Sequence, residues 1–182
     1  VRSSTDESRR ISDPLGGQLY LVALGSNVRH PHFGAPRRVL AAAMAALDGE
    51  GGHVLARAPI VETAPMGPSH RRYANGACLV RTERDPEAML RHLQCIEHRF
   101  GRRRMGRRWR ARVLDLDIVL WNGGAYAVPD LTIPHPAFRE RAFVLAPVTQ
   151  IAGDWRDPIS GLSTRQLFAR LTTPHPLPRG TS

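Results

Sequence analysis

The chain has 182 residues, of which 42% are hydrophobic, which is typical of a single globular domain with its own core. Its formal net charge is +10, but all 26 basic residues are arginine, so part of this charge reflects composition and is weak evidence for a nucleic-acid partner. No apolar run has the length of a membrane span. The two cysteines, Cys78 and Cys95, provide no disulfide framework, and we expect both to be reduced and buried in a cytoplasmic protein.

We expect a disordered leader over 1–17, one folded domain over 18–171 and a flexible tail over 172–182. Within the domain, an apolar segment over 18–24 predicts a strand that stops at the turn Gly25-Ser26-Asn27. An alanine-rich segment over 37–47 predicts a helix, and a strand is expected over 53–61.

The segment over 62–68 contains two prolines and a glycine and cannot continue a regular element. Its fixed backbone suits recognition of the edge of a flat heterocycle, although a plain connecting loop is the alternative. The alternating segment over 73–82 predicts a strand with Tyr73 and Asn75 on one face, where the ring can stack and the amide can form hydrogen bonds. A structural tyrosine on an edge strand is the alternative there.

The next helix is expected to begin at Asp85-Pro86-Glu87, with an acid at the N-cap and proline at the first helical position. Apolar residues at helical spacing continue to Phe100. Gln94 and Glu97 lie three residues apart on what we interpret as the solvated side of this helix.

The stretch over 99–121 has the most unusual chemistry in the chain. Eight arginines precede an apolar run that is interrupted only by Asp115 and Asp117. The run over 113–121 predicts a strand with both faces covered, and the two aspartates lie on the same face of it. The other residues predicted on that face are Val113, Val119 and Trp121.

Asp115 and Asp117 need a positive partner, because carboxylates about 7 Å apart along a strand cannot both stay ionised in an apolar setting without cations. Arg110 and Arg112 are close enough in sequence to form a structural Asp–Arg network. The alternative is Mg²⁺, which binds through one or two carboxylates together with phosphate oxygens. Carboxylates, a loop and many guanidinium groups together indicate a polyphosphate site.

Beyond this strand we expect a short strand over 126–133, interrupted by a proline, and then His135 between two prolines in a stiff, extended segment. Such a histidine can aim a ring nitrogen at an oxyanion, although an exposed loop histidine is the alternative. A turn and a helix follow over 139–151 and bring Arg139, Arg141 and Phe143 near His135. A last helix is expected over 163–171.

Five short motifs occur in a characteristic order: Gly-Ser-Asn at 25–27, TAPMGP at 63–68 with Tyr73 and Asn75, RVLDLDI at 112–118, Pro-His at 134–135, and Arg-Ala-Phe at 141–143. In this order and spacing the chain resembles the 6-hydroxymethyl-7,8-dihydropterin pyrophosphokinase family of folate biosynthesis. The similarity runs from about residue 19 to residue 158. The spacing from RVLDLDI to the two later motifs is its most specific part.

The resemblance implies an α+β fold with a ferredoxin-like core, in which helices pack on a mostly antiparallel sheet. It also implies transfer of the two terminal phosphates of ATP to the hydroxymethyl oxygen of the pterin, with release of AMP. The implied cofactors are two Mg²⁺ ions, with ATP as co-substrate. The implied partners are these small molecules, without membrane or nucleic acid, and a monomer is favoured.

The resemblance also assigns roles to residues. The catalytic positions of the family match Arg102, Arg112, Asp115 and Asp117, and the two aspartates are the metal ligands. The pterin-binding positions match Thr63, Ala64, Met66, Tyr73, Asn75 and Phe143, with the pterin ring between Tyr73 and Phe143. The ATP-binding positions match Gln94, Glu97, Arg104, Trp109, Ile118, Leu131, Thr132, His135 and Arg141.

Three alternatives remain from the sequence. The first is a divergent paralogue with little turnover, because the chain departs from the usual pattern of the family at Arg110-Ala111, Pro136 and Ala64. A nucleic-acid-binding module that uses the basic stretch over 99–112 is another, and its affinity would fall steeply with salt. A two-metal nuclease or phosphatase is the third, and it would differ in its product.

Overall fold

The computed structural model describes residues 16–49, 51–63, 73–101 and 113–174. Their elements, in chain order, are β1 (Gln18–Ser26), α1 (Pro36–Leu47), β2 (Gly52–Arg57), β3 (Val61–Thr63), β4 (Tyr73–Thr82), α2 (Pro86–Arg99), β5 (Asp115–Trp121), β6 (Tyr126–Val128), β7 (Leu131–Ile133), the 3-10 helix η2 (Phe138–Glu140), α3 (Ala142–Ala152) and α4 (Thr164–Thr172).

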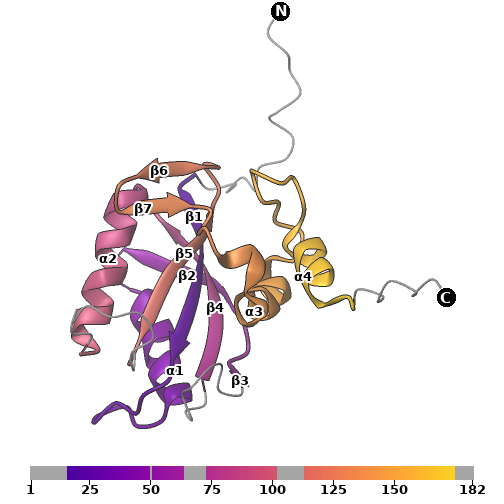
Figure 1. Ribbon diagram of the computed structural model, residues 1–182. Coiled ribbons are helices and arrows are strands. Elements are labelled where there is room, and N and C mark those ends of the chain that lie inside the picture. Colours follow the sequence, from indigo (N-terminus) through magenta and orange to yellow (C-terminus); the bar gives the residue numbers. More distant parts are fainter. Residues whose placement is uncertain (1–15, 50, 64–72, 102–112, 175–182) are drawn as a thin grey trace, which may run out of the picture.

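The main sheet is antiparallel and has the strand order β2-β4-β1-β5, with β3 also paired to β4. Helices α1 and α2 cover one face, α3 packs on the other, and α4 lies against α3 (Figure 1). Strands β6 and β7 form a separate hairpin. With β3 set aside, the order β1-α1-β2-β4-α2-β5 is the ferredoxin-like α+β arrangement, so the predicted fold class is confirmed.

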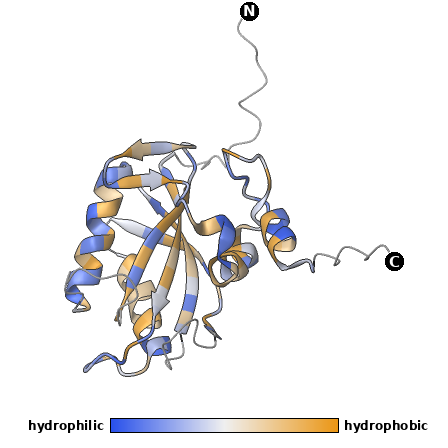
Figure 2. Cartoon of the chain, in the orientation of Figure 1, coloured by the Kyte–Doolittle hydropathy of each residue, from blue (hydrophilic) through white to orange (hydrophobic). Residues whose placement is uncertain are grey.

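Two apolar cores lie on the two faces of the sheet. Because successive strand residues point to opposite faces, β1 supplies both cores in alternation. Tyr20, Val22 and Leu24 pack with α1 and α2, whereas Leu19, Leu21 and Ala23 lie on the α3 side. The helices alternate hydrophilic and hydrophobic residues along their length, as expected for helices with one buried face (Figure 2). None of the described helices is long and apolar enough to cross a membrane.

Two helices begin at the caps that their sequences provide. The Asp85 carboxylate accepts a hydrogen bond from the backbone N–H of Ala88 at 2.7 Å, and Pro86 follows at the first helical position. Ser163 caps α4 and forms a reciprocal capping box with Gln166. These helix starts confirm the predicted ones.

Two predicted strands are divided in the structure. The strand expected over 53–61 is two short strands, β2 and β3, with Pro59 in the break, where it has no N–H for a ladder. The strand expected over 126–133 is the β6–β7 hairpin, with Pro129 in its turn rather than within a strand. In both places proline marks the end of strand pairing.

Two predictions for α2 were wrong. Cys95 was expected to be buried but is exposed, whereas Cys78 on β4 is buried as predicted. Glu97 was expected on the solvated side but is only 4% exposed. Glu97 directly follows the core residue Ile96 and faces the start of β5, so it lies at the buried edge of the helix.

Strand β5 carries a β-bulge at Val119. The ladder with β1 pairs Val22 with Ile118 but the preceding residue, Leu21, with Leu120. Val119 is therefore the extra residue of β5, and the alternation of faces shifts by one position after it.

The bulge changes which residues share a face with Asp115 and Asp117. We expected Val113 and Trp121 on that face, and this was wrong, because both pack against the core formed with α1 and α2. The bulge accounts for Trp121, whereas Val113 lies before the first residue of β5, outside the alternation of the strand. Trp121 is stacked against Tyr20 in that core, with 6.4 Å between ring centroids. The two aspartates remain on the α3 side of the sheet.

Candidate functional site

Gly25 forms the floor of a gap between two polar residues on the sheet. It pairs with Asn75 of β4 on one side and with Asp115 of β5 on the other. A Cβ built on Gly25 would lie 3.9 Å from Asp115 Cβ and 4.0 Å from Asn75 Oδ1. Glycine thus leaves the space between the amide and the carboxylate open. Gly25 and Ser26 belong to β1, so the predicted start of a turn at Gly25 was wrong.

The next row along the sheet places Asp117 beside two alanines. Ala23 pairs with Ala77 of β4 and with Asp117 of β5. Both alanines are buried in the core formed with α3, whereas the side chain of Asp117 is 39% exposed. Both aspartates therefore stand on one face, as predicted, above a surface of small residues.

His135 lies beside Asp117. Its Nε2 is 4.0 Å from Asp117 Oδ2, which is longer than a hydrogen bond. Its Nδ1 accepts a hydrogen bond from the backbone N–H of Ala137 at 3.2 Å. In the neutral ring the proton is therefore on Nε2, on the side of the Asp117 carboxylate.

The bulge of β5 anchors the loop that carries this histidine. The backbone N–H of His135 donates to the carbonyl oxygen of Val119 at 3.1 Å. Val119 is the residue left over by the ladder with β1, so its carbonyl is available to the loop. The bulge thus contributes directly to the geometry of the site.

The short helix η2 connects His135 with two other predicted site residues. Phe138 N–H donates to the His135 carbonyl at 3.1 Å, and Arg141 N–H donates to the Phe138 carbonyl at 3.3 Å. At the start of α3, the guanidinium carbon of Arg141 lies 5.9 Å from the centre of the Phe143 ring. The structure therefore brings His135, Arg141 and Phe143 together in one segment on the α3 side of the sheet.

Glu97 reaches from α2 to the strand that carries the aspartates. Its Oε1 accepts a hydrogen bond from the backbone N–H of Leu116 at 2.8 Å. Leu116 lies between Asp115 and Asp117, so this hydrogen bond fixes the backbone of both. The family resemblance implies a nucleotide contact for Glu97, and the structure shows a structural contact of its carboxylate with the backbone of β5.

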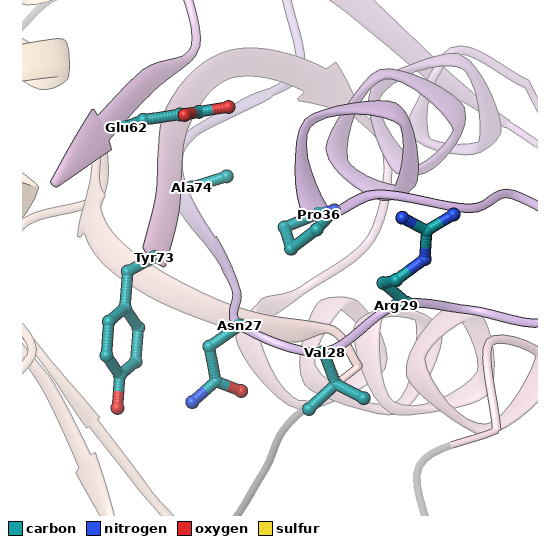
Figure 3. A pocket seen from close by; sticks show the side chains of 7 residues that line it. All are labelled: Asn27, Val28, Arg29, Pro36, Glu62, Tyr73 and Ala74. Carbon is teal, nitrogen blue, oxygen red and sulfur yellow. The ribbon is translucent and has the colours of Figure 1, made fainter. Parts of the chain in front are cut away.

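A cavity of about 530 Å³ lies beside Tyr73, between the start of α1 and the β3–β4 ladder (Figure 3). Its lining residues are Asn27, Val28, Arg29, Pro36, Glu62, Tyr73 and Ala74. The Glu62 carboxylate and the Arg29 guanidinium lie at opposite ends of this opening in Figure 3. Glu62 pairs with Ala74, and Ala74 packs in the core formed with α1 and α2, so this cavity opens on the α1 side of the sheet. It is thus separate from the face that carries Asp115 and Asp117.

The remaining predicted site residues are distributed as follows. Ile118 and Leu131 are buried in the core formed with α1 and α2, Thr132 is exposed, and Gln94 is partly exposed on α2. Thr63 pairs with Tyr73 across the β3–β4 ladder. The predicted residues that lie outside the described part of the chain are Ala64, Met66, Arg102, Arg104, Trp109 and Arg112.

The paired aspartates determine which metal would fit. Among the described residues, no group of three or more His, Cys, Asp or Glu side chains could hold a metal ion. A closed protein site, such as that of structural zinc, is thus not formed by these residues. Two carboxylates on one face suit Mg²⁺, which completes its coordination with water and phosphate oxygens.

Comparison with known proteins agrees with this geometry. A sequence model of the family described as 7,8-dihydro-6-hydroxymethylpterin-pyrophosphokinase (HPPK) matches residues 21–153. Two relatives are named 2-amino-4-hydroxy-6-hydroxymethyldihydropteridine pyrophosphokinase. The one from Haemophilus influenzae is 35% identical, covering 79% of this chain and 87% of the relative. The one from Methylorubrum extorquens is 36% identical, covering 82% and 91%.

Two further matches cover only part of the matched protein. A relative of the same name from Synechocystis is 40% identical, over 58% of this chain and 54% of the relative. The solved HPPK-DHPS structure of Plasmodium falciparum has a TM-score of 0.66 at 12% identity, over 85% of this chain and 44% of that chain, and it supports the fold alone. The family match covers most of the chain, and the chain therefore belongs to the 7,8-dihydro-6-hydroxymethylpterin-pyrophosphokinase family.

Proposed function

We propose that this chain transfers pyrophosphate from ATP to the hydroxymethyl group of 6-hydroxymethyl-7,8-dihydropterin and releases AMP, a transferase reaction of folate biosynthesis (EC 2.7.6.3). The observation that carries the proposal is the pair Asp115 and Asp117 on one face of β5, beside His135, in a member of this family. A cytoplasmic location is consistent with the free thiols of Cys78 and Cys95.

Asp115 and Asp117 would hold two Mg²⁺ ions together with the phosphates of ATP. When bound, such ions neutralise the charge of a polyphosphate and align it for in-line displacement. Attack at phosphorus depends on alignment and charge neutralisation more than on a strong base. The shared face of the two carboxylates supports this role, because one polyphosphate can then reach both.

Two of the predicted ATP-binding residues, His135 and Arg141, lie in one segment beside Asp117, and we call them the nucleotide side of the site. His135 presents an N–H at Nε2 near Asp117, and this N–H can donate to a phosphate oxygen. Arg141 can bind phosphate with two parallel hydrogen bonds. The family resemblance adds Arg102 and Arg112 as partners of the phosphates. It also assigns ATP contacts to Gln94, Glu97, Arg104, Trp109, Ile118, Leu131 and Thr132.

The pterin would bind over Gly25, where the sheet has no side chain. We propose that its ring stacks between Tyr73 and Phe143, while the Asn75 amide forms hydrogen bonds with the ring edge. Gly25 supports this assignment, because it leaves the space between Asn75 and Asp115 open. The resemblance adds Thr63, Ala64 and Met66 as further pterin contacts.

The proposal is tested by following the products with ³¹P NMR. Purified protein, ATP, Mg²⁺ and 6-hydroxymethyl-7,8-dihydropterin should give AMP and a pterin diphosphate in equal amounts, and no AMP should form without the pterin. Release of inorganic phosphate or cleavage of an ester would instead indicate the phosphatase or nuclease alternative. Binding of both ligands without AMP would indicate a divergent paralogue. The family match does not favour the nucleic-acid alternative.

A further inference from the structure

Asp157, in the segment between α3 and α4, is a fully buried carboxylate that none of the roles above uses. Its side chain is 0% exposed and pairs with Arg139 of η2. Arg139 Nε donates to Asp157 Oδ2 at 2.8 Å, and Arg139 Nη2 donates to Oδ1 at 2.7 Å. Two parallel hydrogen bonds of this kind fix orientation as well as distance.

The loop around Asp157 is rigidly organised by the same carboxylate. The backbone N–H groups of Ile159 and Ser160 donate to it at 3.2 Å each, and the Ser160 hydroxyl donates to Oδ2. Burial raises the pKa of the Asp157 carboxyl, but the hydrogen bonds from Arg139, Ser160 and Ile159 outweigh it and hold the pKa below its ordinary value. Asp157 is therefore a fixed anion against which Arg139 is held.

Arg139 occupies the middle of the segment that carries the nucleotide-side residues. It lies four residues after His135 and two before Arg141, and its guanidinium carbon is 4.7 Å from the centre of the ring of Phe138. Phe138 is buried, and its backbone forms hydrogen bonds with both residues. Its carbonyl accepts from the Arg141 N–H, and its N–H donates to the His135 carbonyl. A displacement of Arg139 would thus move His135 and Arg141 together.

We propose that Asp157 is a positioning residue for the nucleotide side of the site: through its paired hydrogen bonds to Arg139 it holds η2, and η2 in turn sets the places of His135 and Arg141. In its effect on activity this inference rests on the proposed function. The orientation of the His135 ring provides a readout that does not depend on it.

The matched control is a buried hydroxyl of the same C-terminal segment that bonds to α3 instead of η2. Thr164 is 0% exposed, and its Oγ1 donates to the Ala152 carbonyl at 2.6 Å. Thr164→Val removes this hydrogen bond at nearly constant volume. Asp157→Asn likewise keeps the volume, but it replaces one acceptor oxygen by an NH₂ group that faces the donors of Arg139.

All variants are compared at a temperature at which their unfolding curves show them to be folded. We expect Asp157→Asn to raise KM for ATP about tenfold, while the Kd for the pterin stays within about twofold of wild type. Thr164→Val should change neither value. The double variant Asp157→Asn/Arg139→Gln restores a neutral hydrogen-bonding pair and should recover part of the loss. Arg139→Lys keeps the charge but loses the two parallel hydrogen bonds to Asp157. It should raise KM for ATP less than Asp157→Asn does.

The second readout is the pair of ¹⁵N chemical shifts of the His135 ring in the free protein. Asp157→Asn should move them as the hydrogen bond from Ala137 to Nδ1 changes, and Thr164→Val should leave them in place. Unchanged ring shifts, or a KM for ATP that moves equally in Asp157→Asn and Thr164→Val, would overturn the inference. If the wild-type protein forms no AMP, the proposed function fails, and the ring shifts still decide whether Asp157 positions His135.

Discussion

The carboxylate of Glu97 and the backbone N–H of Leu116 form a 2.8 Å hydrogen bond that joins α2 to β5 between the two aspartates. The strand is thus held from the α2 side at the point where Asp115 and Asp117 project toward the other face. His135 approaches Asp117 on that other face. The site is consequently supported by the Glu97 hydrogen bond on one face of the sheet and, on the other, by the hydrogen bond from the His135 backbone N–H to the Val119 carbonyl.

The Glu97 hydrogen bond predicts different effects of two substitutions. Glu97→Leu leaves the buried N–H of Leu116 without this acceptor and should lower the free energy of unfolding by about 1–3 kcal/mol. Glu97→Gln retains a carbonyl oxygen as acceptor and should lower the free energy of unfolding by a smaller amount. Urea denaturation of both variants measures these differences. If Glu97→Leu is as stable as wild type, the hydrogen bond does not anchor β5.

Because Gly25 has no side chain, its substitution should cause a selective loss of pterin binding. In Gly25→Ala the new methyl group makes only ordinary contacts with Asp115 and Asn75, so the fold should persist. It nevertheless occupies the space between them, and the Kd for the pterin should rise about tenfold, or about 1.4 kcal/mol. Fluorescence titration with 6-hydroxymethylpterin measures this change.

The control for Gly25 is the same substitution on the other face of the sheet. In Gly76→Ala the new methyl group meets Met44 Cε at 2.7 Å, and this flexible side-chain end can shift. Gly76→Ala should therefore keep the pterin affinity of wild type. Equal losses in Gly25→Ala and Gly76→Ala would contradict a pterin site on the Gly25 face.

The buried Asp157 predicts a pH dependence of stability. Because the pKa of Asp157 is below its ordinary value of 3.8 in the folded chain, its ionised form stabilises the fold above that value. This contribution should disappear as the pH falls below about 3.8 toward the folded-state pKa. Urea denaturation from pH 7 to pH 3 measures the free energy of unfolding. This free energy should decrease less with falling pH in Asp157→Asn than in wild type. Parallel curves for the two proteins would be inconsistent with this coupling.

Most of the fold could be predicted from local patterns in the sequence. The alternation over 73–82 correctly divides Tyr73 and Asn75 from Ala74 and Cys78, because a regular strand keeps a period of two. The bulge at Val119 breaks this period, and it depends on pairing with β1, which no local pattern contains. For this reason Trp121 was placed on the wrong face.

The site was predictable only as far as its residues have recognisable chemistry. The two aspartates in an apolar run are a strong local signal, and they do lie on one face. Glu97 resembles a surface residue until its acceptor role for Leu116 is seen, and burial of this kind depends on tertiary contacts. Asp157 precedes a proline and reads as an ordinary turn residue. Gly25 was predicted to begin a turn, because its place within β1 depends on pairing with β4 and β5.

The central claim is that Asp115 and Asp117 join Mg²⁺-bound ATP to the protein, and the rate of AMP release by Asp117→Ala tests it most directly. The control is Asp130→Ala, which removes an exposed carboxylate in the turn between β6 and β7. With both variants folded, Asp117→Ala should lose at least about a hundredfold in rate, equivalent to about 2.7 kcal/mol of barrier, while Asp130→Ala stays near wild type. An Asp117→Ala enzyme that retains half of the wild-type rate would contradict the claim.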